Sequence, residues 1–310
     1  MSVPVLPTFP QGPAAVIRDG YTWYSQAGIQ SILRRETTNP DSDIGGKLGE
    51  RHKSARQIIS FTPVGEIESL AKSFPLGVSD IGKSIFTASD VPVVIHTYAD
   101  GITHTFGRSG VSKMPSLFLS PNKTFMDAME ITCIGKRATL PTNATFWKAV
   151  ASAAFTDASF DETKVKTDIY TAAYGSSPFN AMGAIEGFKF EITQDNKDVM
   201  DDNVGVYDII LKSLAAMVTF RPNNLSEANI DTLLGMDDST VKLPGQNLAS
   251  AATDLVITSD SLVATLYKAG AKEFTAQYET GEGRPRDLVF VSKRTWTTGV
   301  GNPLWDFTIP

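Results

Sequence analysis

The sequence predicts a mainly β protein, because apolar and polar residues alternate in three runs of the chain. Between Val91 and Ile134 the alternation runs on both sides of Asp100-Gly101, a dipeptide that favours a tight hairpin turn. A second periodic run, Met129 to Cys133, lies at the end of that segment, and a third spans Phe188 to Ile192. Side chains at every second position share one face of a strand, so each segment predicts a half-buried strand.

The N-terminal half adds further strands and two helices to this prediction. Tyr21 to Tyr24, Gly28 to Leu33 and Ile58 to Thr62 carry the aromatic and β-branched residues that suit strands. Apolar residues recur at helical spacing from Ile67 to Phe74, which predicts a helix of about ten residues packed on a sheet. The alanine-rich run from Phe146 to Phe155 predicts a second helix.

The C-terminal half repeats this mixture of strands with one helix. Val204 to Phe220 predicts a long strand, and Pro222 to Gly235 predicts a helix that ends at the glycine. The remaining strand predictions are Leu262 to Tyr267, Phe274 to Tyr278, Leu288 to Val291 and Trp305 to Ile309.

The segment from Arg34 to Arg56 differs in character from its surroundings. It contains Asn39-Pro40, glycines at 45, 46 and 49, and charges of both signs, so it offers little that can be buried. This composition predicts a long mobile loop or a hairpin, and a structureless insert of this length is usually functional or disordered.

Length and composition describe an ordinary globular protein. The chain has 310 residues, 42% of them hydrophobic and 20% charged, which suits one large all-β domain or two smaller ones. No apolar run approaches the roughly 20 residues that span a bilayer, so we expect no membrane partner. Prolines at 4, 7, 10 and 13 fit an extended arm rather than a signal peptide, and predict synthesis in the cytoplasm. The net charge of −6 disfavours tight binding to nucleic acid.

The thiol and the histidines of this chain favour structural roles. Cys133, the single cysteine, excludes an intramolecular disulfide, and its place in an alternating run predicts a buried thiol rather than a nucleophile. His96 and His104 flank the turn at Asp100-Gly101. A two-residue turn pairs Thr97 with His104 and places the two histidines on opposite faces of the sheet, where they cannot share a metal ion.

One segment, Gly77 to Ser84, matches the spacing of a phosphate-binding loop. Such a loop needs a buried strand before it and a helix after it, whose N-terminal amides hold the phosphates. Here a predicted helix and Pro75 precede the match, and a predicted strand follows it closely at Val91. We therefore expect no nucleotide at this segment.

Four aspartates crowd the stretch after Ile192, which we interpret as a solvated turn between two strands. They are Asp195, Asp198, Asp201 and Asp202. Lys197 and Val199 stand where a calcium loop needs oxygen ligands. The chain also lacks a Gly-x-Ser-x-Gly elbow and any recognisable Cys or His nucleophile signature. The sequence thus predicts no catalytic residue, no cofactor and no metal site, although paired carboxylates for glycoside hydrolysis depend on spatial pairing and stay open.

Five stretches, taken in order, match the pattern of a known protein family. They are Asp90-Val-Pro-Val-Val-Ile-His96, Thr105-Phe-Gly-Arg-Ser-Gly-Val-Ser-Lys-Met-Pro115, Leu117-Phe-Leu-Ser120, Glu130-Ile-Thr-Cys-Ile-Gly135 and Gly187-Phe-Lys-Phe-Glu-Ile192. Together they resemble the major tail tube proteins of tailed bacteriophages, from about Ile58 to Gly135 and from Tyr170 to Arg221.

This resemblance implies a tail-tube-type β-sandwich with a flanking α-helix and long loops, in which six subunits form a ring through an intersubunit β-barrel. Stacked rings make the tube through which DNA is ejected into the host. The implied partners are the chain itself, a tape measure protein, and the tail terminator and distal tail proteins. Genomic DNA would pass through the lumen without specific binding, and the protein would reside in the tail of the virion.

The resemblance also implies a role for the segment from Arg34 to Arg56, because a long loop or hairpin between early strands contacts the adjacent ring in this family. The charged residues assigned to this stacking role are Arg34, Arg35, Glu36, Asp41, Asp43, Lys47, Glu50, Arg51, Lys53 and Arg56. The expected organisation is an arm over residues 1–15 and one domain over residues 16–310, with this mobile loop at 34–56 and an insert around 222–260. A β-sandwich module that binds carbohydrate or processes glycosides at a virion or bacterial surface is the alternative.

Overall fold

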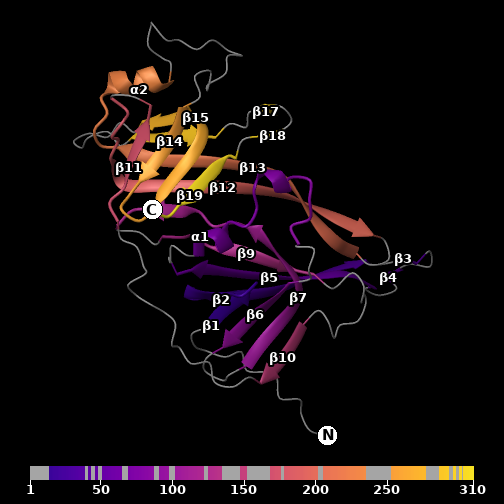
Figure 1. Ribbon diagram of the computed structural model, residues 1–310. Coiled ribbons are helices and arrows are strands. Elements are labelled where there is room, and N and C mark those ends of the chain that lie inside the picture. Colours follow the sequence, from indigo (N-terminus) through magenta and orange to yellow (C-terminus); the bar gives the residue numbers. More distant parts are fainter. Residues whose placement is uncertain are drawn as a thin grey trace.

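The computed structural model describes residues 14–38, 41–42, 46–47, 51–64, 69–86, 91–97, 102–121, 125–134, 147–151, 168–175, 178–201, 205–234, 253–276, 286–292, 296–297, 300–301 and 303–310. Over these residues the chain is mainly β, as the sequence predicts. Its strands form two large antiparallel sheets (Figure 1). One consists of strands from the N-terminal half of the chain, and the other consists of strands from the C-terminal half together with β8, Leu117–Leu119.

The N-terminal sheet has seven strands in the order β10-β7-β6-β1-β2-β5-β9. Their bounds are β1 Ala14–Arg18, β2 Tyr21–Thr38, β5 Arg51–Pro63, β6 Pro92–Thr97, β7 Ile102–Lys113, β9 Met129–Cys133 and β10 Trp147–Ala151. The second half of β7 also pairs with β9, so the sheet curls round and closes on itself.

The C-terminal sheet has eight strands, seven of them in the order β11-β14-β15-β16-β13-β12-β8, with β19 paired to β15. Their bounds are β8 Leu117–Leu119, β11 Thr171–Tyr174, β12 Ala184–Asp201, β13 Gly205–Pro222, β14 Thr253–Thr258, β15 Val263–Ala276, β16 Arg286–Val291 and β19 Trp305–Thr308. Two short pairs complete the strands, β3 Asp41–Ser42 with β4 Gly46–Lys47, and β17 Trp296–Thr297 with β18 Val300–Gly301.

A continuous apolar core joins the two sheets. The alternation predicted for β12 is confirmed, since Phe188, Phe190 and Ile192 are buried and the residues between them are half-exposed. The ring of Phe190 lies 5.2 Å from that of Phe307 on β19, which fixes the C-terminal strand against the core. Burial of such aromatic side chains is the main source of stability in a fold of this kind.

The two α-helices that the structure describes agree with the sequence in place and differ in length. α1, Leu70–Ser73, is a single turn within the helix predicted for Ile67 to Phe74, and residues 65–68 lie outside the described part. The indole nitrogen of Trp23 donates to the Ser73 hydroxyl at 3.2 Å and holds this turn against β2. α2, Glu227–Leu234, confirms the helix predicted after Pro222.

The helix predicted for Phe146 to Phe155 is wrong over the residues that the structure describes. Trp147–Ala151 forms strand β10 and pairs with Phe106–Ile102 of β7. Alanine favours a helix only weakly, by less than about 1 kcal/mol per residue, whereas an added strand satisfies every backbone group along the open side of β7. Tertiary pairing therefore overrides the local preference.

The segment from Arg34 to Arg56 forms a hairpin, which is one of the two structures that the sequence predicts. The other, a long mobile loop, is wrong for residues 34–38 and 51–56. β2 and β5 pair from Ile29↔Phe61 out to Thr38↔Arg51, well beyond the closed sheet (Figure 1). The polar residues of this segment need no core, because cross-strand pairing satisfies their backbone groups. Residues 39–40, 43–45 and 48–50 lie outside the described part.

Two smaller corrections concern strand register and strand boundaries. His104 pairs with Ile95, not with Thr97, a shift of two residues that leaves the predicted faces unchanged. The strands predicted at Leu262 to Tyr267 and Phe274 to Tyr278 are parts of one strand, β15, with a register shift between Ala271 and Glu273.

The structure also changes the limits expected for the N-terminal arm and for the insert around 222–260. Ala14 and Ala15 belong to β1, so the arm contains at most residues 1–13, which are not described. In the insert expected around 222–260, β14 pairs with β11 and β15 inside the C-terminal sheet. That part of the segment is therefore integral to the sheet.

Candidate functional site

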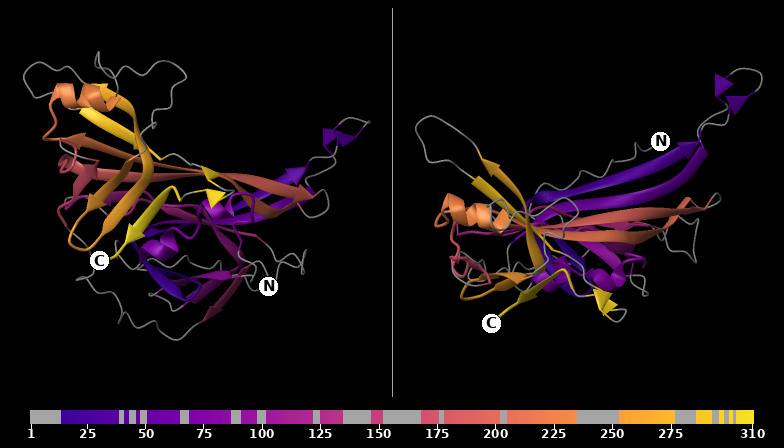
Figure 2. Two further views of the ribbon diagram at one scale, coloured as in Figure 1. Left: turned by 45° about the horizontal axis from the view of Figure 1, so that its top comes forward. Right: turned by 90° about the horizontal axis from the view of Figure 1, so that it is seen from above.

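Two long hairpins extend beyond the packed parts of the sheets, and they project in the same direction (Figure 2). One is β2–β5 from the N-terminal sheet, and the other is β12–β13 from the C-terminal sheet, whose strands pair as far as Asp201↔Gly205. The small pair β3–β4 forms the outer end of the first hairpin. These projections are the parts of the described chain best placed to meet another molecule.

The β2 strand has an open edge along its outer half. β1 pairs with β2 only as far as Tyr24, and β5 occupies the other side of β2 from Ser25 to Thr38. A bulge at Gly28, with φ +89°, separates the covered part of β2 from the open part. Along residues 28–35 no described strand pairs with this edge, and Ile32 and Leu33 are 40% and 43% exposed.

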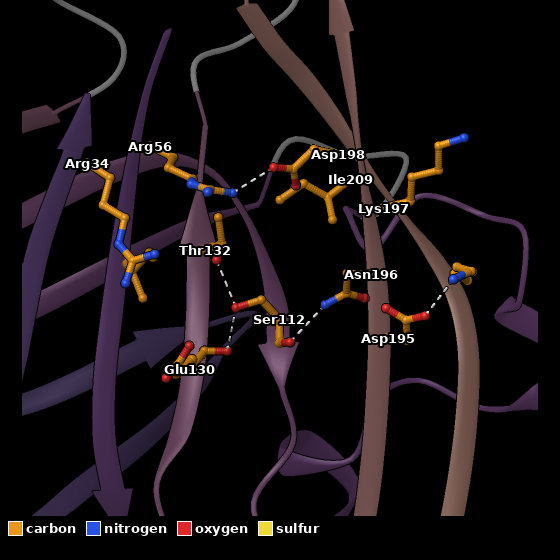
Figure 3. A pocket seen from close by; sticks show the side chains of 12 residues that line it. Arg34, Arg56, Ser112, Glu130, Thr132, Asp195, Asn196, Lys197, Asp198 and Ile209 are labelled. Carbon is orange, nitrogen blue, oxygen red and sulfur yellow. Dashed lines mark hydrogen bonds and ion pairs between the residues drawn. The ribbon is translucent and has the colours of Figure 1, made fainter. Parts of the chain in front are cut away.

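A cleft of about 700 Å³ lies between the two hairpins (Figure 3). Six strands contribute to its lining, which consists of Arg34, Arg56, Ile58, Ser112, Glu130, Thr132, Asp195, Asn196, Lys197, Asp198, Ile209 and Lys212. The register explains one wall, since Arg34↔Arg56 and Ile58↔Thr132 are cross-strand pairs on the outward face of the closed sheet. The other wall belongs to β12 and β13.

Two ion pairs and a chain of hydrogen bonds organise the cleft. Arg56 Nη1 lies 2.9 Å from Asp198 Oδ2 and joins the two hairpins. Lys212 Nζ lies 3.0 Å from Asp195 Oδ2 within the β12–β13 hairpin. Deeper in the cleft, the Asn196 amide donates to the Ser112 carbonyl at 2.8 Å. The contacts of Arg56 and Asn196 hold the two walls together, although a partly exposed ion pair contributes no more than about 1 kcal/mol.

Three charged side chains of the cleft form no ion pair within the described part of the chain. They are Arg34, which is exposed, Glu130, which is half-buried, and Lys197, which is exposed. Arg34 also lies directly across from Arg56. Like charges directly opposite one another on a sheet destabilise it, and Asp198 bonds only one of the two guanidiniums.

The structure brings only part of the predicted stacking set together at the cleft. Arg34 and Arg56 line it, whereas Arg35 follows Arg34 on β2 and so points to the other face of the strand. Glu36, Arg51 and Lys53 lie on the hairpin strands, and Asp41 and Lys47 lie on β3 and β4, with side chains that are not described. Asp43 and Glu50 lie outside the described residues.

Sequence reasoning missed Glu130, Ser112 and Thr132 as cleft residues. The sequence marks these residues only weakly as members of a site, because each lies on the polar face of a strand whose apolar face packs in the core. The solvated-turn interpretation of Asp195 and Asp198 is wrong, since both lie within β12 and form ion pairs with Lys212 and Arg56. Asp202 is not described.

The segment that matches a phosphate-binding loop lies alongside β13. Gly82 N donates to the Leu211 carbonyl at 2.8 Å, and Ile85 N donates to the Ile209 carbonyl at 2.9 Å. The Ser84 hydroxyl donates to Asp208 Oδ1 at 2.5 Å, and strand β6 is the next described element. The amides that a phosphate would require thus already donate to carbonyl oxygens.

The thiol and the metal-ligand side chains occupy structural positions. Cys133 is fully buried on β9, as predicted, and burial raises the pKa of its thiol well above the usual range. Arg18, also buried, donates to the hydroxyl and carbonyl of Ser109, and burial lowers the pKa of its guanidinium. Among the described residues, no three His, Cys, Asp or Glu side chains gather in a way that suits a metal ion.

Comparison with known proteins leaves the family of this chain open. Neither a protein-family model nor a curated protein matches the sequence. Within the described ranges, every helix is too short or too polar to cross a bilayer.

Proposed function

We propose that this protein is a structural subunit that assembles with copies of itself into stacked hexameric rings, and so forms the tail tube of a bacteriophage. In this proposal the two sheets correspond to a tail-tube-type β-sandwich, and β-strands of neighbouring subunits line the channel. The sequence stretches that resemble tail tube proteins support the proposal, and the mainly β fold is consistent with it.

The open edge of β2 is the observation that carries this proposal. Monomeric proteins usually protect such an edge with a short strand, a proline, a lysine or a covering segment, because unpaired N–H and C=O groups recruit another strand. Here residues 28–35 form a long exposed edge with two adjacent apolar side chains, Ile32 and Leu33. Assembly into a closed ring would cover such edges on every copy.

The charge of the chain suits a conduit for DNA. Six copies with a net charge of −6 each would carry −36 per ring, which disfavours adhesion of passing phosphates. The tape measure, tail terminator and distal tail proteins would then be its partners in the tail of the virion, after synthesis in the host cytoplasm.

Electron microscopy of the purified full-length chain tests the proposal directly. We expect negative-stain images of rings or tubes with a central channel, and light scattering that shows a mass of six subunits or more. Monomers at every concentration, even with tail initiator proteins present, would overturn the proposal.

The carbohydrate-processing alternative draws less support from the cleft. Glycoside hydrolysis needs two carboxylates free to act on the substrate, whereas Asp195 and Asp198 are engaged in ion pairs. A monomer that binds oligosaccharides in calorimetry would favour this alternative over assembly.

A further inference from the structure

The wall of the cleft that β2, β5 and β9 form presents cations, apolar surface and a carboxylate in that order. Arg34 and Arg56 are cross-strand partners at one level of this wall. Ile58 lies at the next level, two residues along β5, and Glu130 of β9 lies opposite Ser60, two residues further along β5. Side chains at every second position of a strand share one face of the sheet, so all three levels face the cleft.

The charges at the two ends of this wall are only partly matched. Asp198 binds Arg56 at 2.9 Å, whereas Arg34 forms no ion pair with any described residue. Glu130 is half-buried and forms no ion pair within the same ranges, not even with Lys113, its cross-strand neighbour on β7. A partly desolvated charge without a counter-ion costs free energy, which a bound group of opposite charge lowers. One end of the wall therefore suits an oxyanion, and the other suits a cation.

The two ends of the wall are too far apart for one compact ion to serve both. Glu130 lies four residues along the sheet from the level of Arg34 and two strands away from it. At about 3.3 Å per residue and about 4.8 Å per strand, their backbones are about 16 Å apart. The Arg34 side chain points along the wall toward Glu130 and covers part of this distance (Figure 3). A chain of several methylene groups, packed on Ile58, suits the remainder.

The opposite wall leaves this path along β2, β5 and β9 open. The Asn196 amide donates to the Ser112 carbonyl, and Asp195 binds Lys212. The Lys197 side chain points away from the wall that carries Arg34 and Glu130 (Figure 3). The cleft volume of about 700 Å³ lies within the roughly 300–1,000 Å³ typical of sites for small molecules.

We propose that the cleft binds a small aliphatic molecule with a carboxylate at one end and an ammonium at the other, that is, an ω-amino carboxylate. Its carboxylate accepts hydrogen bonds from the guanidiniums of Arg34 and Arg56, its methylene chain lies against Ile58, and its ammonium pairs with Glu130. Every one of these contacts lies within one subunit. The inference therefore goes beyond the proposed function and does not depend on assembly.

Ligand-detected NMR on the purified full-length chain tests this site with four probes. They are 6-aminohexanoate, which carries both charges, hexanoate and hexylamine, which carry one each, and glycine, which is too short to reach both ends. We expect 6-aminohexanoate to bind with a dissociation constant on the order of 1 mM, because a ligand of so few atoms binds weakly. Each of the other probes lacks one charged contact, so we expect it to bind at least about tenfold more weakly.

Two substitutions separate the contacts at the two ends of the ligand. Arg34→Ala should weaken 6-aminohexanoate about tenfold, because the carboxylate loses a charge-assisted partner. Glu130→Gln should abolish the preference for 6-aminohexanoate over hexanoate, because the ammonium loses its counter-ion. Arg35→Ala is the matched control and should leave binding unchanged, since Arg35 follows Arg34 on β2 and points to the other face. Circular dichroism and the melting temperature show whether each variant folds.

The ranking of the probes on the parent chain decides the proposal even if a variant fails to fold. Equal binding of 6-aminohexanoate and hexanoate would overturn it, as would no binding of any probe well above the expected dissociation constant. An affinity for 6-aminohexanoate that a folded Arg34→Ala variant retains would place the ligand elsewhere and overturn it too. None of these results bears on the proposed function, because microscopy scores rings and tubes separately.

Discussion

Arg34 and Arg56 lie directly opposite each other on β2 and β5, with both side chains in the cleft. Asp198 Oδ2 neutralises Arg56 at 2.9 Å, and Arg34 has no ion pair among the described residues. A cross-strand pair of like charges costs the isolated subunit free energy.

We predict that Arg34→Glu stabilises the isolated subunit. The substitution replaces a repulsive cross-strand pair with an attractive one, which should raise the free energy of unfolding by about 0.2–1 kcal/mol. Urea denaturation of the unassembled subunit measures this gain, which should shrink at high salt because the pair is exposed. Arg35→Glu is the control, because Arg35 lies opposite Ala55 and gains no ion pair there. Equal or lower stability of Arg34→Glu would contradict the electrostatic account.

Gly187→Ala should destabilise the contact between β8 and β12. Gly187 has φ +86°, and a Cβ there would overlap Ser120 Cβ and lie 2.5 Å from the Leu119 carbonyl oxygen. We expect a loss of about 1–3 kcal/mol in the free energy of unfolding. Gly77→Ala is the control, since its nearest neighbour would be 3.9 Å away, and it should stay within about 0.5 kcal/mol of the parent. Similar effects of both substitutions would argue against this steric account.

The Cys133 thiol should resist alkylation in the folded subunit. The side chain is fully buried, and burial raises the pKa of the thiol above its ordinary value of 9.0. Iodoacetamide at about pH 8 should therefore modify the protein only after denaturant is added. Rapid modification of the native chain would show that β9 opens readily.

The same pKa shift predicts how stability depends on pH. The unfolded thiol ionises near its ordinary pKa, whereas the folded thiol stays protonated there. The contribution of Cys133 to the free energy of unfolding is therefore present in full below that pKa and is lost as the pH rises above it. Cys133→Ala should remove this part of the alkaline decline. An unchanged decline in the variant would assign it to other groups.

Alternation predicted strands well where one face packs in the core, as in Phe188 to Ile192 on β12. The helix predicted from the alanine-rich run at Phe146 to Phe155 is wrong at Trp147–Ala151, because these residues pair with β7, some 40 residues earlier in the chain. In the sequence, the hairpin from Arg34 to Arg56 is visible only as a polar insert. Its strands pack against little of the core, so apolar and polar residues do not alternate along them.

The cleft was beyond sequence reasoning for a different reason. Its lining comes from six strands that a one-dimensional pattern cannot bring together, and its ion pairs join residues as distant as Arg56 and Asp198. In the sequence, Glu130 resembles any other residue on the outward face of a strand. Only the spatial arrangement distinguishes it from other exposed carboxylates.

We finally predict that the outer end of the β2–β5 hairpin, residues 39–50 and here called the tip, can be removed without loss of the fold. Thr38 and Arg51 pair directly, so replacement of residues 39–50 by Asn-Gly should close the hairpin with a two-residue turn. The shorter connection costs less chain entropy, so the melting temperature of the subunit should be unchanged or slightly higher. Rings should still form, because the open β2 edge at residues 28–35 is intact, whereas tubes should be lost because every contact between rings lacks its tip.

A second variant, with residues 39–50 replaced by twelve Gly and Ser residues, separates the chemistry of the tip from its length. If charge matters, this variant should also fail to form tubes. Tubes from the Asn-Gly variant would show that the tip is dispensable for stacking, whereas tubes from the Gly-Ser variant alone would show that reach suffices. Loss of rings in both variants would place the tip in the ring contact, because neither replacement touches the β2 edge.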